Sequence, residues 1–403
     1  MQETRKPSSG PLQGIRIVDL TRLLPGPLGA MMMADMGAEV IKIEAPKFKD
    51  YSRDFPPFVN KESASYLAFN RSKRSLALDY KTEEGKAVFW ELIKTADIVI
   101  EQFRPGVMDK MGLGYEDAKK VNPKIIYVSI TGYGQTGPYR DKAGHDLNYI
   151  SYAGVLGITG QRGQTPVIPG IQTADIAGGS YMSVIACLSA LLARQTTGEG
   201  QFVDVSMMDS VMPLAVTAYS LFFATNQPQP RGELFLSGGL ANYNVYPCQD
   251  GKYISLGTLE PKFWMKFCQV VKKPAWMNRM IPKSPEDLDA FYAEISEFFQ
   301  TQPQQYWVDL SDQHDLLISP IYDIHEIEND PQVQARDMIV TQEHPIAGKV
   351  KTIGVPLKFS GTKATPAWAA PVFGADTQAI LNELGYTEEQ MADWEAKKII
   401  KRG

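Results

Sequence analysis

The sequence predicts an α/β protein with a parallel sheet and a second, smaller α+β domain. Short β-branched apolar runs alternate with segments of helical composition over the first two hundred residues. The first of these form a complete strand–helix–strand unit at 15–20, 28–36 and 38–44, and such units build parallel sheets. Beyond a Pro- and Gln-rich linker at 226–232 the character of the chain changes. These observations predict the large sheet domain and the smaller domain, respectively.

Further elements follow in the same order. Strands are predicted at 97–100, 125–130 and 201–206, and helices at 83–95, 115–122, 180–195 and 208–223. The turn after the first strand lacks the G-x-G-x-x-G pattern, and no P-loop pattern occurs, so neither NAD nor ATP is indicated. In the smaller domain, Asp250-Gly251 between two apolar runs predicts a hairpin, and helices are expected at 263–271, 285–300 and 303–310. The tail at 376–401 is predicted to be a pair of helices.

Composition narrows the functional classes. A net charge of −5 gives no global signal for nucleic acid binding. The three cysteines, Cys187, Cys248 and Cys268, lie far apart without metal-ligand spacing, which is typical of reduced thiols in a cytoplasmic protein. The start of the chain, 1–5, leads to no apolar core of signal length, and the apolar helix near 183–193 is expected to be too short to span a bilayer. We therefore expect no metal, no nucleic acid and no membrane among the partners.

Three residues are candidates for acid–base chemistry. His145 follows a glycine in a polar turn, where a lone histidine is more often structural than catalytic. Asp175 precedes Ile176-Ala177-Gly178-Gly179 and a long helix; it is either an N-cap or a tuned base beside backbone that a substrate can approach closely. Glu260 lies between a strand and a helix and gains interest only if it orients His145, as a carboxylate does in a triad.

Basic residues gather just before a short strand. The run 70–79 contains Arg71, Lys73 and Arg74 and ends at Leu78 and Asp79. These cations form either a solvated strand edge or, together with the lone Arg104 after another strand, a phosphate-binding site. Methionines at 31–33, 207 and 208 can line an adaptable acyl pocket, although methionine at helical spacing is more often core.

Several motifs together resemble the family III CoA-transferase and α-methylacyl-CoA racemase superfamily, also called the CaiB/BaiF family. The matching segments are 11–20, 37–44, Arg104-Pro105-Gly106-Val107, 132–138, 197–201 and 329–333, so the resemblance covers nearly the whole chain. It implies a CoA thioester substrate with no cofactor beyond its CoA moiety. It also implies a homodimer of two interlocked rings. A Rossmann-like large domain would comprise 1–224 and the returning 336–403, with 225–335 as the small domain.

Within this family the motifs favour a racemase. Transferases use an aspartate nucleophile at the position of Asp175, whereas racemases use that aspartate as an acid/base opposite a histidine. The racemase motif Gly-His-Asp-hydrophobic-Asn-Tyr is similar to 144–149, and Leu259-Glu260-Pro261 matches a second racemase segment. Leu24 stands where formyl-CoA transferases carry glutamine. The alternative is a CoA-transferase that forms an anhydride on Asp175.

The resemblance also implies roles for individual residues. His145 and Asp175 would face opposite sides of the α-carbon, Glu260 would hold the His145 ring, and the backbone N–H of Asp146 would bind the enolate oxygen. CoA would be bound by Arg71, Lys73, Arg74 and Arg104 near Leu78 and Asp79. One departure concerns the phosphates, because Ala45 stands where racemases often carry arginine.

Overall fold

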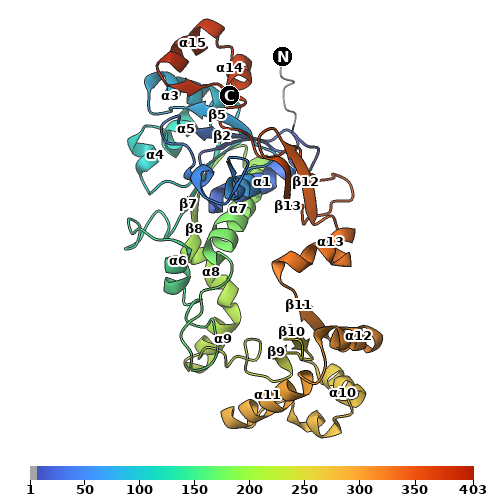
Figure 1. The fold of residues 1–403 in the computed structure, drawn as a ribbon. Helices are drawn as coiled ribbons and strands as arrows, with labels where there is room; N and C mark the ends of the chain where they lie inside the picture. Colours follow the sequence, from blue (N-terminus) through green and yellow to red (C-terminus); the bar gives the residue numbers. More distant parts are fainter. Residues whose placement is uncertain (1–6) are drawn as a thin grey trace. The chain divides into compact units, whose positions relative to one another are not determined.

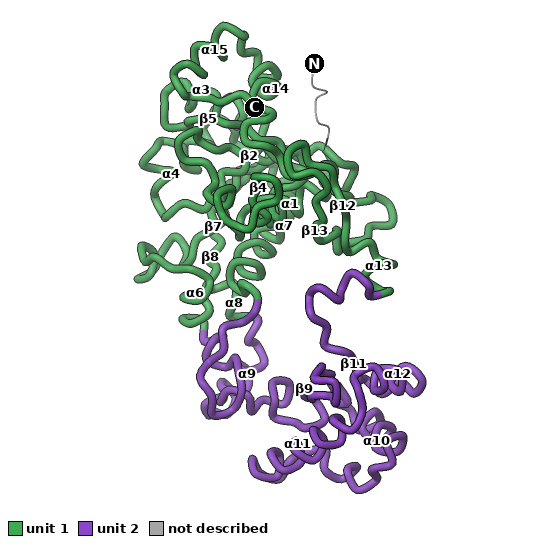
Figure 2. The backbone as a smooth tube through the Cα atoms, viewed as in Figure 1, with its two compact units in different colours: residues 1–153, 171–213, 331–403 green, residues 154–170, 214–330 purple. Residues whose placement is uncertain are grey.

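The computed structural model describes residues 7–403, and these residues form two compact units (Figure 2). The first unit contains 7–153, 171–213 and 331–403, and the second contains 154–170 and 214–330. The sequence placed the boundaries at 224/225 and 335/336. The structure adds 154–170 and 214–224 to the middle unit and gives 331–335 to the large one. The segment 1–5, in which no signal core was expected, lies outside the described residues.

A seven-stranded sheet forms the centre of the first unit, in the order β14-β5-β2-β1-β6-β7-β8 (Figure 1). All neighbouring pairs are parallel except β14 with β5. The strands are β1 (Arg16–Asp19), β2 (Glu39–Glu44), β5 (Arg74–Leu78), β6 (Ile98–Glu101), β7 (Ile126–Thr131), β8 (Phe202–Ser206) and β14 (Ile400–Lys401). The predicted parallel sheet is confirmed. Strand order reverses between β1 and β6, a position where open α/β sheets bind ligands.

Helices connect these strands. They are α1 (Pro25–Asp35), α2 (Ala64–Phe69), α3 (Glu83–Thr95), α4 (Val107–Lys110), α5 (Tyr115–Val121), α6 (Asp146–Tyr152), the π-helix η2 (Ala174–Tyr181), α7 (Met182–Thr197) and α8 (Met207–Val211). The chain returns through α13 (Pro331–Ala335), the hairpin β12 (Ile339–His344) and β13 (Gly348–Ile353), α14 (Thr377–Glu383) and α15 (Glu388–Ala396). The expected helix pair of the tail is α14 and α15.

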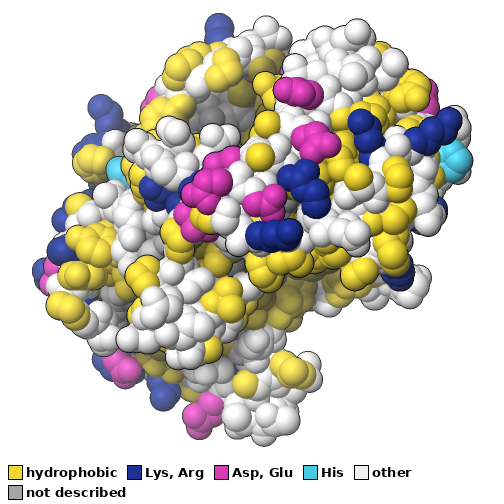
Figure 3. Space-filling model, turned by 90° about the horizontal axis from the view of Figure 1, so that it is seen from below, with side chains coloured by type: hydrophobic (Ala, Val, Ile, Leu, Met, Phe, Trp, Pro, Cys, Tyr) yellow, Lys and Arg dark blue, Asp and Glu magenta, His cyan; other side chains and the backbone are white. Residues whose placement is uncertain are grey.

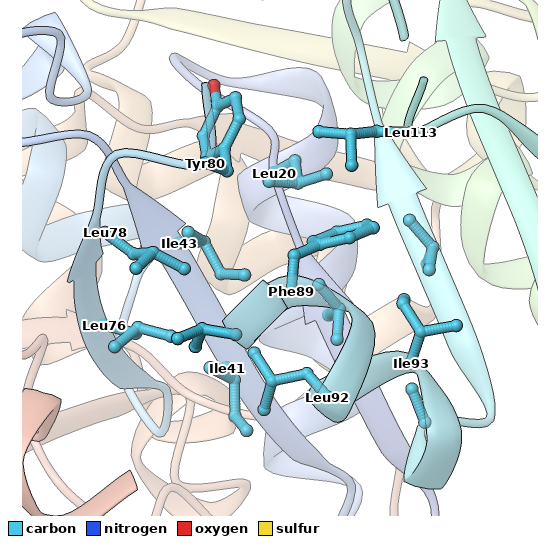
Figure 4. Close-up of a cluster of buried hydrophobic side chains, with 14 of the residues drawn as sticks. Leu20, Ile41, Ile43, Leu76, Leu78, Tyr80, Phe89, Leu92, Ile93 and Leu113 are labelled. Carbon is cyan, nitrogen blue, oxygen red and sulfur yellow. The ribbon is translucent and has the colours of Figure 1, made fainter. Parts of the chain in front are cut away.

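The sequence of α3 explains both its boundaries and its packing. Thr82 caps the helix by accepting the N–H of Gly85, and acidic Glu83 and Glu84 follow in the first turn, where the helix dipole favours negative charge. Val88, Phe89, Leu92 and Ile93 recur at helical spacing and are buried. In Figure 4 the labelled members of this helix face side chains from β2 and β5. This cluster fixes one helix layer on the sheet.

The second unit has a sheet of its own. Strands β9 (Tyr243–Pro247), β10 (Tyr253–Gly257) and β11 (Ile318–Ile321) pair antiparallel, and the predicted hairpin at Asp250-Gly251 is confirmed as β9–β10. The helices are α9 (Val216–Thr225), α10 (Pro261–Val270), α11 (Pro285–Phe299) and α12 (Gln304–His314). Stacked aromatic side chains, among them Trp264, Phe267 and Trp276, fill a separate core.

One expectation about helix length was wrong. The apolar helix near 183–193 is part of a continuous helical segment, Ala174–Thr197, of 24 residues. In the described chain this segment and Met207–Thr225 are long and apolar enough to cross a membrane, a test that the core helices of soluble proteins also pass. Much of this apolar surface is uncovered: Leu192 of α7 is 66% exposed and Phe223 of α9 is 74% exposed. The face of the molecule in Figure 3 likewise carries many hydrophobic side chains among scattered charges.

Candidate active site

A cavity of about 500 Å³ lies at the carboxyl ends of the central strands. Leu23 and Pro25 line it after β1, Arg104 after β6 and Tyr133 after β7. His145 and Asp175 line the same cavity. The structure thus brings the two principal acid–base candidates and one predicted cation together at the reversal of strand order.

Local contacts fix the backbone around His145. Its N–H donates to Asn148 Oδ1 at 3.0 Å, and the hydroxyl of Tyr149 donates to the carbonyl of Gly144 at 2.5 Å. A Cβ on Gly144 would lie 2.7 Å from the Tyr149 ring, so only glycine fits here. The histidine therefore sits at the N-cap position of α6, held by residues of its own motif.

Asp146 carries out the capping that the sequence suggested for Asp175. Its Oδ1 accepts the N–H groups of Ala174 at 2.5 Å and of Asp175 at 3.1 Å. Asp175 is the second residue of the π-helix η2, not its cap, so the N-cap interpretation of this residue is wrong. Its carboxylate remains part of the cavity wall, and π-helical turns are frequent at functional sites.

The environment tunes the Asp175 carboxyl. Burial, followed by the nearby Asp146 charge, raises the pKa of Asp175 to about 6, while His145 acts in the opposite direction. A carboxyl with a pKa close to the operating pH can both accept and return a proton. The electrostatic influence of His145 also means that the two side chains lie within interaction range of each other.

The glycines after Asp175 serve packing. A Cβ on Gly178 would lie 2.8 Å from the Met207 carbonyl oxygen, and one on Gly179 would lie 2.5 Å from Pro25 Cβ. Both glycines are buried between η2 and its neighbours α1 and α8. The expectation that they expose backbone to a substrate is corrected, since helices occupy that space.

The predicted basic run is also corrected. Arg71 pairs with Asp35 at 2.8 Å, Lys73 with Asp19 at 2.9 Å, and Arg74 with Glu39 and Glu383 at 2.6 and 2.7 Å. All three cationic side chains are buried, and each is neutralised by protein carboxylates. Burial lowers the pKa of Lys73 to about 8. The geometry argues against a role in binding CoA phosphates and favours a structural one.

The remaining predicted positions near this run make contacts within the protein. Leu78 is buried in the core, and the N–H of Asp79 donates to the Ile399 carbonyl at 2.7 Å. Ala45 is buried as well. Glu260 is exposed and belongs to the second unit, at the N-cap position of α10, so its pairing with His145 stays a prediction.

Two cations that the sequence analysis missed line the cavity with Arg104. Arg140 Nε donates to the Gln135 carbonyl at 3.0 Å, and Lys142 Nζ lies 3.0 Å from the Tyr152 hydroxyl and 4.0 Å from the centre of the Tyr139 ring. Their position within five residues of His145 was the available signal. The cations are therefore supplied by loops at the carboxyl edge of the sheet.

The methionines divide between core and cavity. Met33 is fully buried, whereas Met31 and Met32 line a second, apolar cavity of about 570 Å³ together with Ile176. Met207 lines the first cavity. In the described residues no group of three or more His, Cys, Asp or Glu side chains could hold a metal ion.

The chain is similar in sequence to proteins of one known family. The profile of CoA-transferase family III matches residues 12–377. Human succinyl-CoA:glutarate CoA-transferase is 33% identical over 380 residues, covering 93% of this chain and 86% of the relative. Human α-methylacyl-CoA racemase is 32% identical over 394 residues, covering 97% of both chains. Formyl-CoA:oxalate CoA-transferase of Rhodopseudomonas palustris (strain BisA53) is 32% identical, covering 95% of both.

Solved structures give the same result. A CaiB/BaiF family protein from Brucella suis superposes with a TM-score of 0.82 at 30% identity, covering 94% of this chain and all of the other. Rv3272 from Mycobacterium tuberculosis superposes with a TM-score of 0.77 at 28% identity, covering 93% and 99%. Matched over nearly its full length in sequence and in structure, the chain belongs to CoA-transferase family III, which includes both transferase and racemase relatives.

Proposed function

We propose that this protein racemises or epimerises 2-methylacyl-CoA thioesters by 1,1-proton transfer through an enolate. The observation that carries the proposal is the pair of titratable groups, His145 and Asp175, on the wall of one cavity. A proton transfer that inverts a carbon needs two groups that exchange protons at its two faces. Nucleophilic transfer needs only the aspartate.

The α-proton of a thioester is weakly acidic, so its removal requires a positioned base and stabilisation of the enolate oxygen. In our mechanism one of His145 and Asp175 takes the α-proton, the C–H electron pair delocalises into the thioester carbonyl, and the other group returns a proton to the opposite face. The pKa of Asp175, raised to about 6 by burial and by the Asp146 charge, suits this exchange. The Asp146 N–H at the start of α6 is our candidate donor to the enolate oxygen.

The CoA moiety would be held by the cations of the cavity, Arg104, Arg140 and Lys142. Binding of this remote group can fix the acyl carbon between the two acid–base groups. No cofactor beyond CoA is needed for the proton transfer. Glu260 would orient the His145 ring.

CoA transfer is the second candidate, supported by the transferase relatives. In that reaction the Asp175 carboxylate attacks the thioester carbonyl, the C–S bond breaks, and CoA leaves as its thiolate. The result is a mixed anhydride on the enzyme. His145 would then be secondary.

We also propose a homodimer of interlocked chains in the cytoplasm. Exposed apolar side chains on α7 and on α9 support burial against a second copy. The three cysteines are free and buried, which suits a reducing compartment. Light scattering coupled to size exclusion would test this assembly, and a monomeric mass would contradict it.

One experiment separates the two reactions. The protein is incubated with a 2-methylacyl-CoA in deuterated water without an acceptor acid, and deuterium at the α-carbon is followed by mass spectrometry. Incorporation that is lost in His145→Ala and Asp175→Asn supports the racemase. Absence of incorporation across a panel of acyl groups, together with hydroxylamine trapping of an acyl-enzyme, would establish the transferase instead.

A further inference from the structure

A buried glutamate lies directly behind the cavity. Glu101 is the last residue of β6, next to the loop that carries Arg104, and is only 5% exposed. No cation is paired with it among the ion pairs of the described chain. A buried carboxylate without a counter-ion is costly, so it must be held by hydrogen bonds.

Both carboxylate oxygens accept hydrogen bonds, one from the Arg104 loop and one from strand β7. Glu101 Oε2 accepts the N–H of Phe103 at 2.7 Å, which bends the chain immediately before Arg104. Glu101 Oε1 accepts the hydroxyl of Ser129 from the neighbouring strand β7. That hydroxyl oxygen in turn accepts Gln135 Nε2 at 2.7 Å.

The connection continues to the second cation. The Gln135 carbonyl accepts Arg140 Nε at 3.0 Å, so the glutamate and Arg140 are joined through Ser129 and Gln135. In the Arg104 loop, Gln102 is also bound to the turn after β1, because its side-chain amide donates to the Arg22 carbonyl at 2.6 Å. Glu101 is thus the one group in this network that touches the Arg104 loop and leads to the Arg140 loop.

We infer that Glu101 is a positioning residue that, in its ionised form, holds the Arg104 and Arg140 loops in the geometry that binds the CoA moiety. The inference rests on the proposed CoA binding at this cavity but not on the choice between racemase and transferase. It assigns Glu101 to binding: its loss weakens CoA affinity and raises KM, while kcat at saturation stays close to wild type.

The donor pattern favours the carboxylate. The Ser129 hydroxyl donates to one oxygen of Glu101 while it accepts from Gln135, and Phe103 donates its N–H to the other oxygen. A proton on either oxygen of Glu101 would compete with one of these donors. Burial raises the pKa of Glu101 to about 7, the Asp109 charge of α4 acts in the same direction, and the two hydrogen bonds act against it. The other titratable neighbour is the Tyr127 hydroxyl of β7. The carboxyl therefore changes charge around neutral pH.

The test is calorimetric titration of the full chain with coenzyme A at pH 6 and pH 8. At pH 8 we expect Glu101→Gln to bind CoA roughly tenfold more weakly than wild type, since an amide cannot accept from both donors. At pH 6, where the wild-type carboxyl is mostly protonated, the two proteins should agree within about twofold. A phosphate monoester also titrates near pH 6, but this affects both proteins equally.

Asp97→Asn is the matched control. It removes a carboxylate next to the opposite end of the same strand, where Asp97 accepts the N–H of Arg16 at 2.9 Å, and should leave CoA affinity within about twofold of wild type. Ser129→Ala breaks the link to Gln135 and should weaken CoA binding several-fold at pH 8. If circular dichroism shows that Glu101→Gln is not folded, the CoA affinity of Ser129→Ala at pH 8 provides the test of the inference.

Three outcomes would overturn the inference: wild-type affinity of Glu101→Gln at pH 8, an equal loss at both pH values, or an effect on kcat without an effect on KM. Wild-type protein that fails to bind CoA at either pH would instead remove the proposed function.

Discussion

The charge on Asp146 offers a way to shift the pH dependence of catalysis without dismantling the site. In Asp146→Asn the side-chain carbonyl can still accept the N–H groups of Ala174 and Asp175, but the negative charge is gone. The pKa of Asp175 rises from its usual 3.8 to about 6, with burial as the first cause and Asp146 as the second. Because burial is the larger cause of this rise of about two units, we assign about one unit, or about 1.4 kcal/mol, to the Asp146 charge.

We therefore expect the pKa of Asp175 to fall by up to about one unit in Asp146→Asn. As a base, Asp175 must be ionised, so the rate of α-proton exchange should decline below about pH 6 in wild type and only below about pH 5 in the variant. The assay is deuterium incorporation into one enantiomer of a 2-methylacyl-CoA, measured as kcat/KM between pH 4.5 and 8. Asp97→Asn, which removes a charge near the opposite edge of the sheet, serves as the control.

An acidic limb that stays in place in Asp146→Asn, or that moves to higher pH, would refute this reasoning. The same shift in Asp97→Asn would show that overall charge, and not the Asp146–Asp175 pair, sets the profile.

Three further predictions follow from the geometry. His145→Ala should slow α-proton exchange at least about 100-fold while the CoA dissociation constant stays within about twofold; exchange at the wild-type rate would contradict the mechanism. Lys73→Met leaves the Asp19 carboxylate buried without its partner and should lower the free energy of unfolding in urea by about 3–5 kcal/mol, whereas a loss of CoA affinity with unchanged stability would restore the phosphate-binding role. Gly179→Ala forces a methyl group against Pro25 and should lower the free energy of unfolding by about 1–3 kcal/mol in the same measurement; a free energy of unfolding equal to wild type would show that η2 has room to move.

The sheet could be predicted because its information is local. The strands β1, β2, β6 and β7 are short, mainly apolar runs that are almost entirely buried, and α3 shows a clear helical periodicity of buried residues. The division into two units was harder to predict from the sequence. Residues 154–170 belong to the second unit because of tertiary contacts, which local sequence patterns do not predict.

For the site, motifs identified the chemistry but not the partners. His145 and Asp175 do share a cavity, as the motif predicts. The prediction that the basic run binds phosphates was wrong because its cations pair with distant carboxylates. Arg74, for example, bonds to Glu383, 309 positions later in the sequence, and its neighbours in the chain do not predict that it is buried. Likewise, the capping carboxylate of η2 comes from Asp146, 28 residues before the helix starts.

The returning tail has a consequence for the order of synthesis. Ser75 of β5 donates its N–H to Asp376 at 2.9 Å, and β14 pairs with the edge of the same strand, so β5 is completed by residues made about 300 positions later. At roughly 5–20 residues per second a ribosome needs on the order of 15–60 s to cover that distance. During this time β5 has an open edge and Arg74 lacks Glu383, while the whole of the second unit is synthesised. Nascent chains should therefore protect the second unit from protease before the first, and the sheet domain should depend on chaperones until release.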